Sequence, residues 1–102
     1  MFIVVFTVTN SAQFVSIDAG LGNDSIYNTG DNVSINASDG NDTITNSGKN
    51  VSIDAGGGND SIVNYVDNVT VDLTEVTAAI DTVVSYSRNV TIIGADDNDV
   101  IT

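Results

Sequence analysis

Three aspartates, Asp24, Asp42 and Asp60, recur at a fixed spacing of 18 residues. Each follows a segment containing glycine and an asparagine, and an isoleucine stands two residues after each of them. The chain has no cysteine and no histidine, so the available metal ligands are carboxylates, carbonyls and hydroxyls. These oxygen donors are the ligand set of calcium rather than of zinc. The composition therefore favours calcium over zinc as the cation that these aspartates could bind.

Paired carboxylates are also the catalytic groups of glycosidases. A catalytic site, however, breaks a repeat at one place, whereas these aspartates recur identically at a fixed interval. We therefore expect the chain not to be an enzyme.

The charge of the chain limits its partners. Its 102 residues include 14 acidic and 2 basic side chains, which gives a formal charge of -12. This balance excludes a nucleic-acid surface and argues against anionic membranes, and it favours a cation as partner. The apolar start, residues 1–8, is too short to span a bilayer and lacks the flanks of a secretory peptide. We therefore expect neither a membrane span nor a secretory peptide there, and we interpret this segment as a first strand or end cap.

The whole chain divides into nonapeptide units, of which one, residues 73–84, is extended to twelve residues. The eighth position of each unit is aliphatic, and the seventh is Ser or Thr in nearly every unit. This alternation is typical of short, half-buried strands. The aliphatic positions are Val8, Ile17, Ile26, Ile35, Ile44, Ile53, Ile62, Val71, Val83, Ile92 and Ile101.

Two kinds of unit alternate, so one turn of chain takes 18 residues. The fold class predicted is all-β, a parallel β-roll or two-sheet β-solenoid with a loop row along each edge; a three-sided solenoid is the alternative. We expect one domain over residues 1–102. Its parts are a cap turn without metal ligands (1–18), regular calcium repeats (19–72), a unit with an insertion (73–84) and a degenerate C-terminal turn (85–102).

Four units carry a known motif. Residues 19–27 (AGLGNDSIY) and 55–63 (AGGGNDSIV) match Gly-Gly-x-Gly-x-Asp-x-apolar-x except for Ala at the first position. Residues 37–45 (ASDGNDTIT) and 94–102 (GADDNDVIT) keep the aspartate and the isoleucine, although Asp97 replaces a glycine in the last unit. In these features the chain resembles the RTX (repeats-in-toxin) family. The resemblance implies a right-handed parallel β-roll that binds Ca²⁺.

The resemblance also implies which residues bind calcium. One ion would lie between loops of successive turns, shared first by Asp24 and Asp42 and then by Asp42 and Asp60. Backbone carbonyls would complete each site, because glycine loops can turn their carbonyls inward. These carbonyls would come from Ala19, Gly20, Gly22, Ala37, Gly40, Ala55, Gly56 and Gly58. Whether Asp81 and Asp99 complete further sites stays open, since the insertion near residues 77–79 interrupts the glycine loop.

The second edge departs from the motif. Valines stand where the ligand aspartate belongs, so no calcium is expected on this edge. Asparagines recur here in register, and we expect them to pass hydrogen bonds between turns and to form left-handed corners. The valines are Val15, Val33, Val51, Val69 and Val90. The asparagines are Asn10, Asn28, Asn46 and Asn64, with Asn32, Asn50, Asn68 and Asn89.

The function expected is that of a calcium-dependent structural rod in a secreted or cell-surface bacterial protein. Its thin interior and stacked carboxylates predict that it folds only with cations. Both ends finish on a whole repeat, which predicts head-to-tail self-association into fibres. The alternatives are an adhesin segment and an ice-binding solenoid. The loop position relevant to ice binding holds Leu21, Asp39, Gly57 and Asp96, so a threonine row is missing there.

Overall fold

The computed structural model describes residues 5–75, 79–94 and 99–102. The first half of the apolar start (1–4), most of the insertion (76–78) and the last loop with Asp96 and Asp97 (95–98) lie outside the described residues. Within the described ranges the chain forms eleven short strands. They are β1 (Thr7–Asn10), β2 (Ser16–Asp18), β3 (Ser25–Asn28), β4 (Ser34–Asn36), β5 (Thr43–Asn46), β6 (Val51–Asp54), β7 (Ser61–Asn64), β8 (Val69–Asp72), β9 (Thr82–Ser85), β10 (Val90–Ile93) and β11 (Val100–Ile101).

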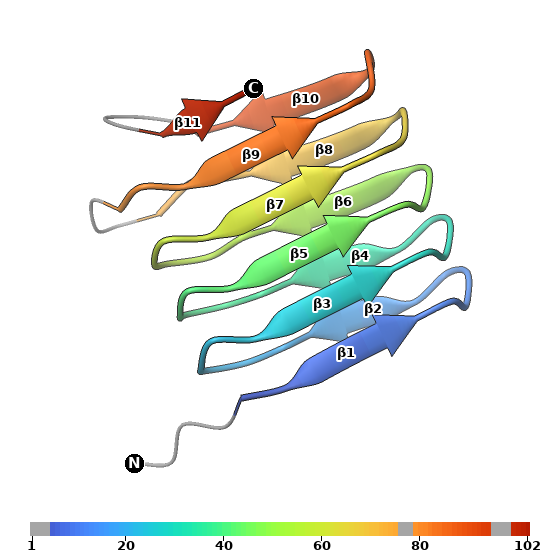
Figure 1. Cartoon of the computed structure of the whole chain (residues 1–102). Coiled ribbons are helices and arrows are strands. Elements are labelled where there is room, and N and C mark those ends of the chain that lie inside the picture. Colours follow the sequence, from blue (N-terminus) through green and yellow to red (C-terminus); the bar gives the residue numbers. More distant parts are fainter. Residues whose placement is uncertain (1–4, 76–78, 95–98) are drawn as a thin grey trace.

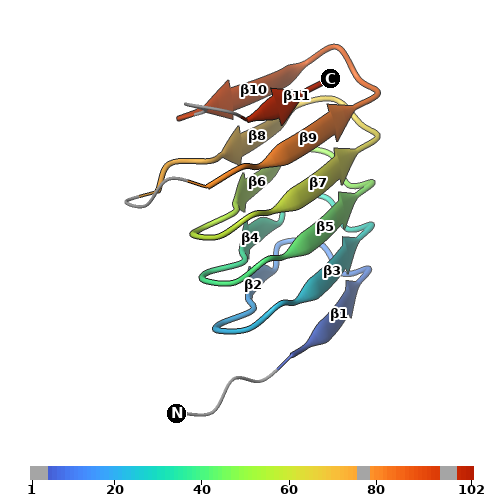
Figure 2. The same cartoon turned by 60° about the vertical axis from the view of Figure 1, so that its left-hand side comes forward.

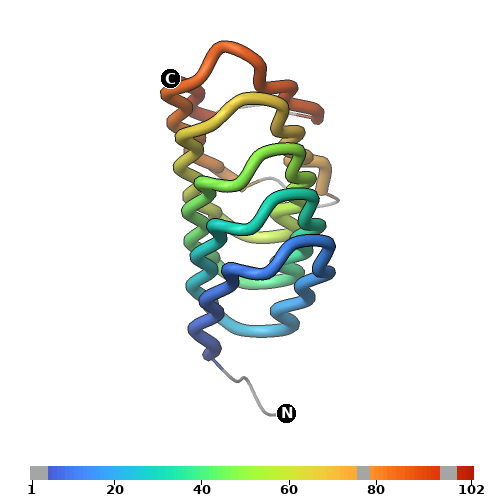
Figure 3. The backbone as a smooth tube through the Cα atoms, turned by 90° about the vertical axis from the view of Figure 1, so that its right-hand side faces the viewer, coloured from blue at the N-terminus to red at the C-terminus, as the bar shows by residue number. Residues whose placement is uncertain are grey.

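The strands form two parallel sheets. Odd-numbered strands pair in the order β1-β3-β5-β7-β9-β11, and even-numbered strands in the order β10-β8-β6-β4-β2. The chain crosses from one sheet to the other after every strand and winds as a right-handed coil (Figure 1). The two sheets form two walls, and the loops stack along the two edges between them (Figures 2 and 3). The two-sheet β-solenoid is therefore confirmed, and the three-sided alternative is wrong.

The register of the sheets follows the 18-residue period. Ile26 pairs with Ile44, and Ile44 pairs with Ile62, so each eighth position stacks on the same position of the next turn. The stacked aliphatic side chains fill the interior between the walls, and most of them are fully buried. The core also includes Val33, Val51 and Val69 of the second edge and Ala19, Ala37, Ala55 and Leu73 of the first. The alanines that replace the first motif glycine are therefore core side chains.

The corners of the second edge are left-handed, as predicted for asparagine. Asn32, Asn50 and Asn68 have φ angles of 58°, 55° and 62°. Phe14 occupies the same place in the first turn with a φ of 58°. Asn89 is not in this conformation, and neither are Asn10, Asn28, Asn46 and Asn64, so the expectation of left-handed corners is wrong for these five. Asparagine tolerates the left-handed region better than other residues with a Cβ atom, so the asparagine column has a backbone reason.

Candidate metal site

Five aspartates stack as one column along the first edge, each directly before a strand of the six-stranded sheet. We call Asp24, Asp42, Asp60, Asp81 and Asp99 the aspartate column. The first four are 0–2% exposed. The backbone N–H of Asp24 donates to Oδ1 of Asp42 at 2.7 Å, and the N–H of Asp42 donates to Oδ1 of Asp60 at 2.8 Å. Each carboxylate thus reaches back to the turn before it.

The column continues across the long unit. The N–H of Asp60 donates to Oδ1 of Asp81 at 2.8 Å, and the N–H of Asp81 donates to Oδ1 of Asp99 at 2.9 Å. Strand β9 stays in register with β7, with Thr82 opposite Ser61. The three additional residues therefore leave the column unbroken. The carboxylate of Asp81 accepts the same backbone hydrogen bond as the aspartates before it, and its Oδ2 likewise has no partner. At the other end the N–H of Phe6 donates to Oδ1 of Asp24 at 2.7 Å.

The second oxygen of these carboxylates has no partner. Oδ2 of Asp24, Asp42, Asp60 and Asp81 is buried and makes no hydrogen bond within the described structure. Leaving a buried polar atom unsatisfied is costly, and leaving a charged oxygen unsatisfied costs more. The four oxygens therefore require a proton or a cation. This property of the donor set fits the calcium that the sequence motif implies.

Burial makes the charged form of these groups unfavourable. It raises the pKa of Asp60 from 3.8 to about 8. The negative charges of Asp81, Asp42 and Glu75 also raise this pKa, whereas the hydrogen bond from the Asp42 amide lowers it. Burial also raises the pKa of Asp42 and of Asp81. A cation beside the column would reverse this effect, because an opposite charge favours the ionised carboxylate.

The glycine loops next to the column are packed closely from turn to turn. A Cβ atom on Gly40 would lie 1.9 Å from the carbonyl oxygen of Gly22, and one on Gly58 would lie 2.2 Å from that of Gly40. Their φ angles, 134° and 111°, also favour glycine. These two glycines therefore have a stacking role that requires no metal. Their recurrence alone does not establish calcium binding, and the unpartnered carboxylate oxygens are the stronger indication.

Hydrogen bonds also join these loops. The amide of Gly22 donates to the carbonyl of Asp39 at 3.1 Å, and the amide of Gly40 donates to that of Gly57 at 2.9 Å. In the next turn the acceptor is a side chain instead of a backbone carbonyl: Oε2 of Glu75 accepts a hydrogen bond from the amide of Gly58 at 3.2 Å. Asp39, Gly57 and Glu75 all occupy the third position of their units.

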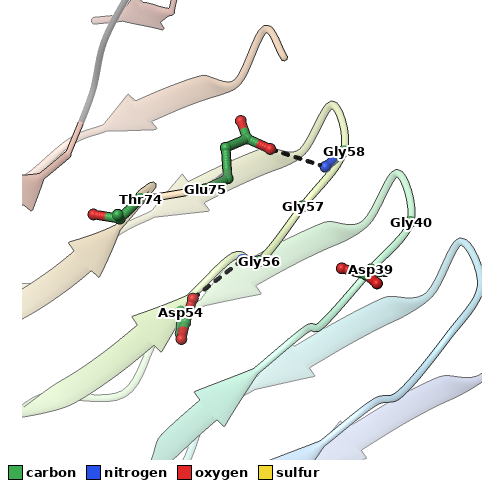
Figure 4. Close-up of a pocket in the computed structure, with 8 residues that line it drawn as sticks. All are labelled: Asp39, Gly40, Asp54, Gly56, Gly57, Gly58, Thr74 and Glu75. Atoms are coloured by element: carbon green, nitrogen blue, oxygen red, sulfur yellow. Dashed lines mark hydrogen bonds between the residues drawn. The ribbon is translucent and has the colours of Figure 1, made fainter. Parts of the chain in front are cut away.

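An open groove of about 580 Å³ lies outside these loops (Figure 4). It is lined by Asp39, Gly40, Asp54, Gly56, Gly57, Gly58, Thr74 and Glu75. The side chains of its three acidic residues, Asp39, Asp54 and Glu75, were not predicted as ligands, although the third-position register contained a signal for Asp39 and Glu75. In the described part of the chain, no group of three or more Cys, Asp or Glu side chains could hold a metal ion by themselves. A bound ion would therefore need backbone oxygens as well as carboxylates.

The residues predicted to supply carbonyl ligands lie in these same loops. Ala19, Ala37 and Ala55 have buried side chains and donate their amides to the next turn, to the carbonyls of Asn36, Asp54 and Asp72. Gly20 and Gly56 have φ angles of 83° and 82°. The structure thus brings the predicted loops next to the aspartate column, and their role as ligands stays a prediction.

The second edge gives an internal comparison, because its buried side chains are neutral. Nδ2 of Asn28 donates to Oδ1 of Asn46 at 2.9 Å and to the carbonyl of Gly30 at 2.9 Å. Its own Oδ1 accepts from the amide of Gly30 at 3.1 Å and from Nδ2 of Asn10 at 2.8 Å. The amide therefore satisfies both of its polar atoms. The predicted hydrogen-bond ladder is confirmed, and it contrasts with the unpartnered oxygens of the aspartate column.

The comparisons with known proteins leave the family open. No family model matches the chain, and no curated protein or solved structure shows significant similarity to it. The likeness to RTX repeats thus depends on the motif alone. The described residues include no helix long and apolar enough to cross a membrane.

Proposed function

We propose that this chain is a calcium-dependent structural β-roll that works outside the cell or at the cell surface and has no enzymatic activity. The observation that carries the proposal is the row of four buried carboxylate oxygens without partners. Calcium prefers carboxylate and carbonyl oxygens, and both kinds of donor occur where the glycine loops pass the aspartate column.

The residues proposed as ligands are those of the motif. Carboxylate oxygens would come from the aspartate column, including Asp81 and Asp99. Carbonyl oxygens would come from the loops at 19–22, 37–40 and 55–58. Bound calcium would supply the positive charge that the buried carboxylates lack, and its binding free energy would add to the stability of the fold. Millimolar calcium outside cells suits such a role.

Calcium titration of the chelator-treated protein, followed by circular dichroism, tests this proposal. We expect strand signal to appear on addition of calcium and to be lost again with chelator. Asp60→Asn should weaken the calcium response, because it removes one ligand charge from the column. Asp67→Asn is the matched control, since Asp67 is exposed on the second edge and lies outside the column. Full folding in excess chelator at neutral pH, or equal calcium responses of the two variants, would refute the proposal.

Self-association is the second part of the proposal. Within the described roll, strands β1 and β2 at one end and strands β10 and β11 at the other each have one edge without a neighbouring strand. Exposed apolar side chains lie at these ends: Val5, Phe6, Ile93, Val100 and Ile101. Unpaired parallel edges can accept strands of another copy. We infer head-to-tail stacking of rolls into fibres.

Sedimentation at increasing protein concentration in calcium tests the stacking. Ile101→Lys places a charge on the terminal strand and should reduce the assembly. Leu21→Lys is the control, because Leu21 is equally exposed but lies in a loop of the second turn. A monomer at all concentrations would refute this part and leave the calcium site unaffected.

A further inference from the structure

Two tyrosine rings stack on the outside of the roll. Tyr65 and Tyr86 have ring centroids 5.2 Å apart and an interplanar angle of 7°. They follow directly after Asn64 and Ser85, which pair across strands β7 and β9. The rings are therefore neighbours through the in-register stacking of two turns, although 21 residues separate them in the chain.

The backbone holds both tyrosines in place while the rings stay accessible. The amide of Tyr65 donates to the carbonyl of Asn46 at 3.0 Å, and the amide of Tyr86 donates to that of Asn64 at 2.9 Å. The side chains are 53% and 69% exposed. An oxidant in solution can therefore reach either phenol, and a radical on one ring has the other phenol as its nearest aromatic neighbour.

From this geometry we propose that Tyr65 and Tyr86 form an oxidative cross-linking site, at which a peroxidase and hydrogen peroxide join the two rings. Each phenol loses one electron and one proton, and a carbon–carbon bond forms between ring carbons ortho to the hydroxyls. The peroxide is reduced to two water molecules. The product is a dityrosine that staples two successive turns of the solenoid. It does not depend on calcium being the ion of the aspartate column.

The third tyrosine of the chain provides a control. Tyr27 is 49% exposed, similar to Tyr65, but it lies on the outer face of strand β3. Its in-register neighbours are Thr9 on β1 and Thr45 on β5, so neither strand beside it places an aromatic ring next to Tyr27. Tyr27 should therefore react only with another molecule.

The test treats dilute full-length protein in calcium with a haem peroxidase and hydrogen peroxide. We expect dityrosine fluorescence in the monomer, a mass lower by two hydrogen atoms, and one cross-linked peptide joining Tyr65 to Tyr86. Tyr65→Phe and Tyr86→Phe should each abolish this product while keeping the aromatic stack, and Tyr27→Phe should retain it. The same reaction in urea should give little of it.

Three results would overturn the proposal. They are a monomer product that survives either Tyr65→Phe or Tyr86→Phe, dityrosine found only between molecules, and an equal yield in urea. A cross-link that closes a loop also restricts the unfolded chain. The cross-linked monomer should therefore melt at a higher temperature than peroxidase-treated Tyr65→Phe, and an unchanged midpoint would refute the stapling.

Discussion

Acid should stabilise the metal-free protein, contrary to the behaviour of most carboxylate-rich folds. Burial raises the pKa of Asp60 from 3.8 to about 8, so the folded state holds a proton on this group more tightly than the unfolded state does. Between these two values the folded chain binds more protons, and stability therefore falls as the pH rises. Asp42 and Asp81 act in the same direction, because their pKa values are also raised.

The size of the effect follows from the change in pKa. Each tenfold change in an ionisation constant corresponds to about 1.4 kcal/mol. Moving the pKa of Asp60 from 3.8 to about 8 thus destabilises the fold by on the order of 5 kcal/mol between acid and weakly alkaline pH. A small domain has only about 5–15 kcal/mol of total stability. In chelator the roll should therefore be folded at low pH and largely unfolded above pH 8.

Urea denaturation at a series of pH values in chelator, followed by circular dichroism, measures this dependence. Asp60→Asn keeps the size and the accepting oxygen of the side chain but cannot ionise. We expect the metal-free variant to be more stable than the original chain at pH 7 and to show a weaker pH dependence. Asp67→Asn removes the same charge from an exposed position and measures the general effect of lowering the net charge of -12.

In saturating calcium at pH 7 the original chain should be more stable than Asp60→Asn, the reverse of their order in chelator. The original chain then has a cation beside its ionised column, whereas Asp60→Asn has lost one ligand charge. A rise in the stability of the metal-free chain between pH 4 and pH 8 would contradict a raised pKa of Asp60. So would an Asp60→Asn variant that has no more effect in chelator than Asp67→Asn.

Three further predictions, one with a control variant, concern the two edges of the roll. Gly40→Ala should lower the free energy of unfolding, measured by urea denaturation, by about 3 kcal/mol or more, because its Cβ would overlap the Gly22 carbonyl. Gly20→Ala is the control: its Cβ meets nothing within 4 Å, so it should lower the free energy of unfolding by only about 1–2 kcal/mol, for its positive φ. Equal losses in the two variants would contradict the stacking role of Gly40. Phe14→Asn should raise the free energy of unfolding by about 1 kcal/mol, because Phe14 is 78% exposed and has a left-handed φ of 58°, which asparagine tolerates better. A loss of stability would show that the ring makes a contact that the fold needs. Asn46→Ala should cost about 2–4 kcal/mol by leaving ladder neighbours unpartnered, and a change below about 1 kcal/mol would show that the ladder contributes little.

Much of the fold could be predicted because the repeat is regular. In a parallel, in-register solenoid, residues one period apart must stack, so the spacing of Ile26, Ile44 and Ile62 was enough to place them in one core column. The aspartate column and the asparagine ladder followed from the same rule. The effect of the insertion could not be predicted in this way, because it depends on whether Thr82 still pairs with Ser61.

The site was less predictable than the fold. The sequence identified the aspartates but not that Oδ1 is bound to the preceding turn while Oδ2 has no partner. Nor did it show that Glu75 reaches back to Gly58, or that Tyr65 and Tyr86 stack across the long unit. These features depend on side-chain direction and on distances of a few ångströms.

By itself, then, the sequence determined which residues of the regular repeats share a column, because residues one period apart stack on each other in a parallel, in-register solenoid. Only the tertiary structure decided what each column can do. An amide and a carboxylate of nearly equal size are both buried in columns at the edges of the roll, yet the amide of Asn28 satisfies both of its polar atoms and the carboxylate of Asp42 satisfies one. The physical reason is that a carboxylate has no proton to donate to the turn next to it.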